Sequence, residues 1–234
     1  MLNILKELHR RALDQDGELE TLQRAVIGAC SADANRVLDV GCGFGRMLQP
    51  LAAAGLAVTG VEINQEIVAA NRRKGLDCLT ADEFKDTTGD FDVILMAHVI
   101  EHFSPDDLLT FMDGYLDRLR IGGRLIIATP LMSKYFYDDF DHIKPYQPAG
   151  VLMVFGKSAQ VQYYSRNKLA LTGLVYRRSP FRISYARSRY VRSPWRFLLM
   201  ATDLLSGAVF LASAKLIGKT DGWIGVFEKV DGTP

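Results

Sequence analysis

The chain has 234 residues, of which 48% are hydrophobic and 24% are charged. This composition excludes a disordered or fibrous chain, and the length suffices for one domain with its own core. The net charge is +1, but residues 151–234 carry 13 Lys and Arg against 4 Asp and Glu, whereas residues 1–150 carry 15 against 23. This division fits either a basic attachment joined to the core of the domain or a basic flap that covers an anionic substrate.

The three cysteines, Cys30, Cys42 and Cys78, have no CxxC spacing. We expect neither a disulfide framework nor a structural zinc site, and no other metal site. Charged residues interrupt every apolar run near the N-terminus, so we expect no secretory signal. These features predict a cytoplasmic protein.

Helical periodicity over residues 3–30, broken at 14–17, predicts two N-terminal helices. From residue 36 onward, short apolar runs alternate with helical segments, which predicts crossover connections and a parallel sheet. The expected strands cover 36–40, 57–61, 77–79, 91–96 and 124–129, and the expected helices cover 45–54, 64–74 and 108–119, the last closing at Gly122-Gly123.

The pattern is less regular beyond Pro130. It predicts a short helix at 149–156, strands at 161–164 and 173–185, a helix from Ser193 to Ile217 and a last strand at 223–228. The fold class is α/β, a doubly wound and mostly parallel seven-stranded sheet. As one domain it would comprise a helical cap at 1–33, a cofactor-binding core at 34–172, a basic and apolar insertion at 173–220, and a last strand and tail at 221–234.

The central motif is a glycine turn after the first strand. Asp39 ends the strand, and Gly41, Gly43 and Gly45 follow before the next helix. Such a junction lets a ligand lie against bare backbone N–H groups at a helix N-terminus. Glu62 ends the next strand about 20 residues later, where dinucleotide-binding folds place a ribose acceptor.

These residues resemble the motifs of class I S-adenosylmethionine-dependent methyltransferases. Asp39 to Gly45 looks like the first motif, Glu62 and Ala81-Asp82 like the next two, and Phe91–Phe103 with Gly122–Leu125 like the later ones. The resemblance covers about residues 34–150 and the final strand, and it implies S-adenosylmethionine as cofactor. A nicotinamide dinucleotide is the alternative, but its fingerprint is GxGxxG rather than GxGxG.

The resemblance and the residue chemistry together give an expected cofactor site. Glu62 can accept both ribose hydroxyls, Asp39 would face the ammonium group or orient the turn, and Asp82 would accept the adenine amine. As alternatives, the glycines could serve close packing alone, and Glu62 could be only a helix N-cap residue. The expected cofactor-binding residues are Asp39, Gly41, Cys42, Gly43, Gly45, Glu62, Ile63, Asp82, Glu83, Phe84, Ala97 and His98.

Methyl transfer is a displacement at carbon, so positioning supplies most of the catalysis, and a base is needed only for a weakly nucleophilic acceptor. In family members with a similar loop, a histidine at the place of His142 reaches the acceptor pocket. We expect His142 as base or positioning group, with His98 as the second catalytic candidate and His142, Tyr146, Arg177 and Arg178 as acceptor-binding residues. Either histidine could instead be structural, and Glu101-His102 is expected to be so.

The segment before the last strand departs from a minimal family domain. Seven arginines and no acid lie between Arg177 and Arg196, and Phe197–Ile217 contains only Asp203 and Lys215 as charges. Arginines next to an apolar helix fit a peripheral membrane contact through 187–218, or a lid over an anionic acceptor. Packing on the sheet or on a second copy, as a homodimer, is the alternative, and Asp203 argues against a true membrane span.

The predicted function is S-adenosylmethionine-dependent methylation of oxygen, or less favourably nitrogen, on a small-molecule or glycan or lipid-linked acceptor with anionic groups. Two alternatives remain: a non-catalytic partner that keeps the cofactor fold and regulates another enzyme, or an RNA methyltransferase. A nucleic-acid partner is disfavoured because no added binding module is visible. The expected location is cytoplasmic, with peripheral contact at the inner face of the membrane.

Overall fold

A computed structural model describes residues 17–157, 163–181 and 196–232. The chain divides into two compact units, one of Leu19–Val175 with Trp223–Pro234 and one of Met1–Glu18 with Tyr176–Gly222. The first expected N-terminal helix, residues 161–162 of an expected strand and most of the arginine-rich stretch lie outside the described residues.

Seven strands form one sheet in the order β3-β2-β1-β4-β5-β7-β6. The first five pair in parallel, with β1 between β2 and β4. Contacts join Thr172 to Val226 and Arg177 to Asp221, so β6 and β7 run antiparallel. The predicted doubly wound, mostly parallel sheet is confirmed. Its strands are β1 (Arg36–Val40), β2 (Ala57–Glu62), β3 (Cys78–Thr80), β4 (Phe91–Ala97), β5 (Leu119–Pro130), β6 (Lys168–Ser179) and β7 (Lys219–Val230).

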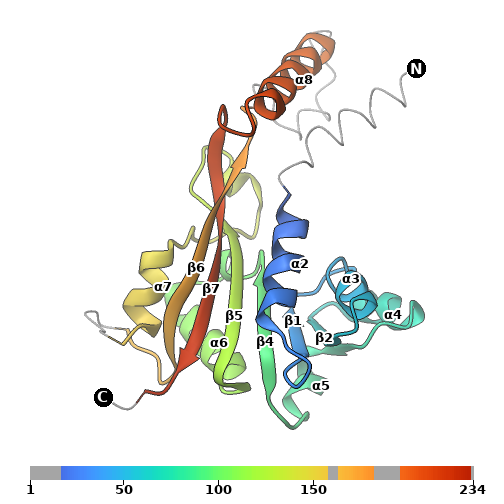
Figure 1. Cartoon of the computed structure of the whole chain (residues 1–234), viewed down its shortest axis with the longest axis vertical. Helices are drawn as coiled ribbons and strands as arrows, with labels where there is room; N and C mark the ends of the chain where they lie inside the picture. The colour runs from blue at the N-terminus through green and yellow to red at the C-terminus, as the bar shows by residue number, and fades with distance from the viewer. Residues whose placement is uncertain (1–16, 158–162, 182–195, 233–234) are drawn as a thin grey trace. The chain divides into compact units, whose positions relative to one another are not determined.

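Helices cover both faces of this sheet (Figure 1). Successive β1 side chains point to opposite faces: Val37 packs in a cluster with α2 and α3, and Leu38 in a larger cluster with α5, α6 and α7. Both faces being buried explains why β4 is almost continuously apolar. The helices are α2 (Glu18–Ala29), α3 (Leu48–Ala53), α4 (Gln65–Arg73), α5 (Ala81–Lys85), α6 (Pro105–Leu116), α7 (Pro148–Phe155) and α8 (Arg196–Ala212).

Side-chain caps fix several helix starts at the carboxyl edge of the sheet. Asn64 accepts from the backbone N–H groups of Glu66 and Ile67 at the start of α4, at 2.9 and 3.4 Å. Thr80 and Glu83 form a reciprocal capping box on α5. Such caps place these helix N-termini directly beside the ends of β2 and β3.

The structure corrects several of the expected elements, including the strand expected at 173–185, which is β6 at Lys168–Ser179, and the helix expected to reach Ile217, which is α8 and ends at Ala212. Helix α3 begins only at Leu48, because residues 41–47 are a turn, and the short α5 is an element that the sequence pattern did not predict. Helix α6 ends at Leu116, and Gly122-Gly123 lie inside β5 beside a register shift opposite Phe91–Val93. Glycine permits this irregularity, because a Cβ on Gly123 would come within 2.7 to 2.9 Å of Leu119, Arg120 and Asp92 atoms. Residues 163–164 are not in a strand.

The second unit contains α8 and the strand ends on either side of it. Within it, the Arg177 side chain pairs with Asp221 at 2.9 Å and with Glu18. Among the described residues, no helix combines the length and apolarity that a membrane crossing requires.

Candidate active site

The glycine turn has three left-handed glycines with different neighbours. Their φ values are +70° for Gly41, +51° for Gly43 and +80° for Gly45. A Cβ on Gly41 would lie 2.8 Å from Val99 and one on Gly45 2.7 Å from Leu76, whereas one on Gly43 would meet no described atom within 4 Å. Close packing therefore explains the glycines at positions 41 and 45, as the alternative interpretation had it. Gly43 instead borders open space.

Glu62 ties the end of β2 to this turn. One carboxylate oxygen accepts from the Gly43 N–H at 3.0 Å, and the other accepts from the Asn64 N–H at 3.0 Å. The N-cap of α4 is Asn64, so Glu62 is not the capping residue. The carboxylate is partly exposed, at the carboxyl edge where a ligand of this fold class binds.

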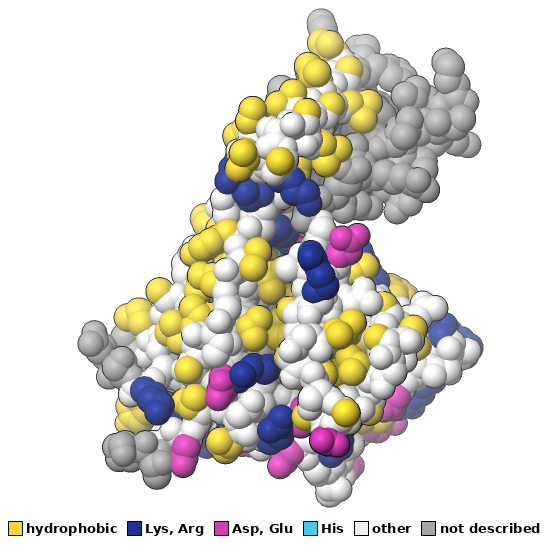
Figure 2. Space-filling view, viewed as in Figure 1, with side chains coloured by type: hydrophobic (Ala, Val, Ile, Leu, Met, Phe, Trp, Pro, Cys, Tyr) yellow, Lys and Arg dark blue, Asp and Glu magenta, His cyan; other side chains and the backbone are white. Residues whose placement is uncertain are grey.

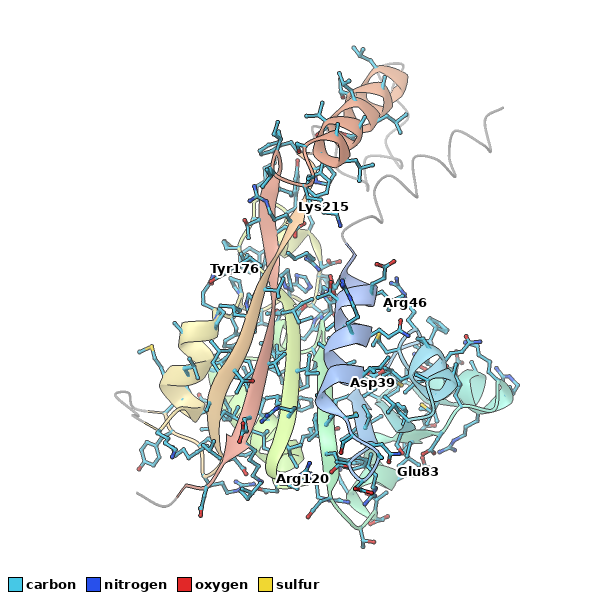
Figure 3. The ribbon with its side chains drawn as sticks, viewed as in Figure 1. Asp39, Arg46, Glu83, Arg120, Tyr176 and Lys215 are labelled. Atoms are coloured by element: carbon cyan, nitrogen blue, oxygen red, sulfur yellow. The ribbon has the colours of Figure 1, made fainter. Side chains whose placement is uncertain are left out.

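Asp39 lies inside the sheet at the end of β1 and is 3% exposed (Figure 3). Burial, reinforced by the nearby Glu62 carboxylate, raises the pKa of Asp39 to about 7. A buried acid with its pKa near neutrality is typical of a functional site. A cationic group brought to this edge would favour its ionised form.

Beneath the turn, a polar residue that the sequence did not point to holds the backbone. The buried Asn71 side chain on α4 donates to the Gly43 carbonyl at 2.7 Å, and it also contacts the Cys78 thiol at 3.6 Å. Cys42 and Cys78 lie with their sulfurs 3.6 Å apart, and burial raises the pKa of the Cys42 thiol. The Cys42 side chain thus packs in the core against Cys78 and supports the glycine turn from its buried side.

The residues expected around the adenine divide into two groups. Ile63 is 86% exposed at the edge, and Asp82 is exposed beside Lys85. Glu83 is engaged by Arg72 at 2.6 Å and by the α5 cap, which together lower its pKa to about 2.

Phe84 belongs to the core instead, and is 7% exposed. Its ring stacks on Tyr115 at a centroid distance of 5.1 Å, and the Arg118 guanidinium lies 5.2 Å from the ring centroid. These contacts occupy the ring, so Phe84 is left out of the site proposed below.

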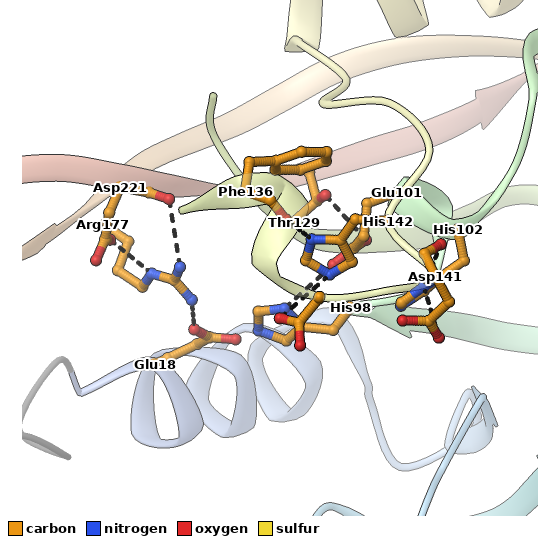
Figure 4. Close-up of polar contacts among 11 residues, drawn as sticks. Glu18, His98, Glu101, His102, Thr129, Phe136, Asp141, His142, Arg177 and Asp221 are labelled. Atoms are coloured by element: carbon orange, nitrogen blue, oxygen red, sulfur yellow. Dashed lines mark hydrogen bonds and ion pairs between the residues drawn. The ribbon is translucent and has the colours of Figure 1, made fainter. Parts of the chain in front are cut away.

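His98 follows Ala97 at the end of β4 with a φ of +58°, a strained conformation for this residue type. Its Nδ1 lies 3.3 Å from Oε1 of Glu101, a carboxylate with no exposed surface. Thr129 donates to the other oxygen at 3.0 Å, and Oε1 has no hydrogen-bond partner among the described residues (Figure 4). A buried carboxylate oxygen thus faces a half-exposed imidazole at the carboxyl edge.

His142 lies in the loop after β5 and is brought back to the same edge. The Glu101 carbonyl accepts from the N–H groups of Ile143 and Lys144, at 2.8 and 3.2 Å, which anchors the loop. The His142 side chain is 12% exposed, and its Nδ1 lies 2.8 Å from the Phe136 carbonyl oxygen. Its ring centroid is 5.0 Å from that of His102.

Glu101, His102 and His142 also bring one ligand atom each within 4.8 Å of one another. Two imidazole nitrogens and a carboxylate oxygen at that spacing can hold a divalent cation. We expected no metal site from the sequence, in which His142 lies 40 positions after the adjacent Glu101 and His102, and the fold brings the three residues together.

The other expected acceptor residues are engaged elsewhere. Tyr146 is 8% exposed and donates to the Phe103 carbonyl at 3.0 Å, and burial raises its pKa to about 12. Arg177 is ion-paired as described above, and Arg178 donates to the Leu216 carbonyl at 2.8 Å. Neither arginine belongs to the unit that contains the glycine turn.

A family model described as a methyltransferase domain matches residues 5–171 of this chain. The chain belongs to this family. The expectations of a methyltransferase and of S-adenosylmethionine as its methyl donor are confirmed at the level of the family.

Relatives of the methyltransferase domain include ubiquinone biosynthesis O-methyltransferases. That of Parvibaculum lavamentivorans is 35% identical over 102 residues, which is 40% of each chain. That of Rhizobium leguminosarum is 31% identical over 49% of this chain and 48% of its own length. The chain thus spans less than half the length of these relatives.

Solved structures share the fold of the methyltransferase domain. A SAM-dependent methyltransferase from Archaeoglobus fulgidus has a TM-score of 0.58 and 17% identity, covering 91% of this chain and 95% of its own. Magnesium protoporphyrin IX methyltransferase from Synechocystis, with bound SAM, has a TM-score of 0.57 and 13% identity, covering 99% and 86%.

Proposed function

We propose that this domain transfers a methyl group from S-adenosylmethionine to an oxygen atom of a small-molecule acceptor. The observation that carries the proposal is the open space over Gly43, beside the carboxylates of Glu62 and Asp39. Oxygen as the accepting atom is supported by the relatives, which are named O-methyltransferases.

The residues at the turn fit this cofactor. When bound, the cofactor supplies a methyl group on a positively charged sulfur, and its leaving group is neutral. Glu62 would hold the ribose hydroxyls, Asp39 would stabilise the ammonium group, and Asp82 with Ile63 would lie along the adenine. Gly41, Cys42 and Gly45 would shape and brace the turn rather than touch the ligand, and Glu83 would hold the start of α5 through Thr80 and Arg72.

His142 is the proposed base, with His98 beside it. The Phe136 carbonyl can only accept, so it favours a proton on Nδ1 of His142, and in the neutral ring the lone pair then lies on Nε2, 3.8 Å from a carboxylate oxygen of Asp139. A hydroxyl held there could pass its proton to Nε2 as its oxygen attacks the methyl carbon. His98 and Ala97, at the end of β4, would line the floor of the site.

Calorimetry with S-adenosylmethionine tests the first half of this proposal. We expect saturable binding by the wild type and a loss of binding in Gly43→Arg, whose side chain would fill the open space. Gly114→Arg is the matched control, because a Cβ there also meets no described atom within 4 Å but lies in α6. Absence of heat with the wild type would overturn the proposal.

A panel of acceptors tests the second half. Phenols, catechols, carboxylates, glycans and RNA would each be incubated with enzyme and labelled cofactor. Label in an oxygen-linked methyl group of a small molecule, as an ether or an ester, is the expected result. Label only in glycan or RNA would contradict the small-molecule acceptor while leaving cofactor binding intact.

The finer expectations about partners remain proposals of ours. These are a homodimer and a peripheral membrane contact through 187–218, and a glycan or lipid-linked acceptor with anionic groups is the alternative that the acceptor panel distinguishes. The last rests on the exposed face of α8.

A further inference from the structure

In helix α8 the acidic residue is buried and several large apolar residues are exposed, which is the reverse of the usual arrangement in a surface helix. Asp203 is 3% exposed and Phe210 1%, so the acid of this helix is on its buried side. Leu198, Leu205 and Val209 are 57%, 67% and 40% exposed. Their spacing of seven and four residues places them in one stripe. A surface helix normally carries charged residues on its exposed face. The exposed apolar face of α8 is therefore suited to contact with an apolar phase or surface.

The turn after α8 extends the stripe and has a defined backbone. The Lys215 N–H donates to the Phe210 carbonyl at 2.8 Å, and the Ser213 hydroxyl accepts from the Ile217 N–H at 2.9 Å. These bonds hold Leu216 and Ile217 outward, at 72% and 54% exposure. Apolar side chains are therefore presented over the whole length of the helix and its final turn.

The charges around this stripe have one sign. In the described part of this unit the acids are Glu18, Asp203 and Asp221, and none is exposed. Lys215 is exposed at the end of the helix, and basic side chains gather at its base (Figure 2). The sequence from 182 to 195 adds four arginines and no acid. The placement of that stretch lies outside the described residues.

We propose that α8 and the turn after it dock on an anionic lipid surface, with the leucine stripe in the acyl boundary and the basic residues at the headgroups. Such helices lie in the interface plane, and their binding depends on buried apolar area together with attraction to anionic lipid. A second copy of the chain is the less favoured occupant, because two basic surfaces would face each other. The inference is independent of the chemistry proposed at the sheet edge.

Vesicle co-sedimentation of the full chain tests this inference. The vesicles are phosphatidylcholine alone or phosphatidylcholine mixed with phosphatidylglycerol. We expect binding to the mixed vesicles, roughly tenfold weaker binding to phosphatidylcholine alone, and weakening with added salt. The double variant Leu205→Gln/Leu216→Gln should bind the mixed vesicles at least roughly tenfold more weakly, because it removes two large apolar groups from the boundary.

Ile121→Gln is the matched control, since Ile121 is 57% exposed but belongs to β5 in the other unit. It should bind vesicles like the wild type. Circular dichroism and cofactor calorimetry would verify that each variant is folded. Equal binding by the double variant and the wild type, or no binding by the wild type, would overturn the inference. So would a wild-type dimer that the double variant converts to a monomer without any vesicle dependence.

Discussion

Nδ1 of His142 lies 2.8 Å from the carbonyl oxygen of Phe136, so the backbone of the loop itself selects the tautomer of this histidine. The second nitrogen then carries the lone pair that an acceptor hydroxyl would need. Replacing His142 with Gln should lower kcat by roughly 10²–10⁴, the usual contribution of a positioned base. The cofactor Kd should change little, because the loop is anchored through the Glu101 backbone.

Single-turnover rates across pH, with cofactor calorimetry on the same samples, would check this. The limb of the pH profile that reports the base should disappear in His142→Gln. His102→Gln is the control, because its ring adjoins His142 but pairs with Asp141 at 3.2 Å. An unchanged kcat in His142→Gln would assign that role elsewhere.

The two carboxylate oxygens of Glu62 are each used by a backbone N–H group at 3.0 Å. Glu62→Gln keeps one acceptor oxygen and loses the charge, so the turn and any ribose contact both weaken. Hydrogen bonds to charged groups are worth roughly 1.5–3 kcal/mol, so we expect the cofactor Kd to rise about 10- to 100-fold. Glu66→Gln, in the exposed first turn of α4, should leave the Kd unchanged in the same titration.

The three glycines of the turn should respond differently to alanine. Gly45→Ala forces a Cβ to 2.7 Å from Leu76 and 3.0 Å from Asn71, so it should lower the thermal midpoint by several degrees. Gly43→Ala carries only the left-handed strain of roughly 1–2 kcal/mol, yet it narrows the open space. Thermal unfolding and calorimetry together should show mainly lost stability in the first variant and mainly lost cofactor binding in the second.

Asp39 gives a pH dependence of stability with a definite sign. Its pKa is raised from 3.8 to about 7 in the folded chain, so between those values the folded chain keeps a proton that the unfolded chain releases. The free energy of unfolding should therefore fall as pH rises from about 4 to 7, at most by about 1.4 kcal/mol per unit. Asp39→Asn should flatten that part of the curve in urea unfolding at several pH values. A parallel curve would contradict the raised pKa.

His98 combines a left-handed backbone with a position at the sheet edge. Glycine adopts a φ of +58° without strain, whereas valine is strongly disfavoured there. His98→Gly should unfold no earlier than the wild type while methyl transfer slows, and His98→Val should unfold several degrees earlier. Finding that His98→Gly is both less stable and fully active would contradict a functional cause for the strain.

Most of the fold could be predicted from patterns within short stretches of the sequence. Apolar runs and glycine breaks placed most strands and helices to within a few residues. The end of α6 and the start of β5 were wrong, because Gly122-Gly123 looks like a helix stop, whereas pairing with β4 makes it a strand irregularity. That pairing is set by the sheet, which a local pattern does not contain.

The candidate site could be predicted only where its residues lie close together in the sequence. Gly41, Gly43, Gly45 and Glu62 are recognisable by spacing. The link from Asn71 to the Gly43 carbonyl crosses 28 positions, and the contact of Glu101 with the 142–144 loop crosses about 40. Phe84 and Tyr146 were predicted to contact ligands, but both are buried through contacts with α6 and β7 that a local pattern does not contain.

The hydrogen bond from Asn71 to Gly43 makes the conformation of the glycine turn depend on α4. The side chain that holds the turn in shape is supplied by a neighbouring helix and not by the loop itself, so the loop can be no more ordered than that helix is. Local unfolding of α4 that reaches Asn71 would break its hydrogen bond to the Gly43 carbonyl. The glycine turn would then gain conformational freedom. Affinity for the cofactor should therefore vary with the local stability of a helix whose exposed side never meets it.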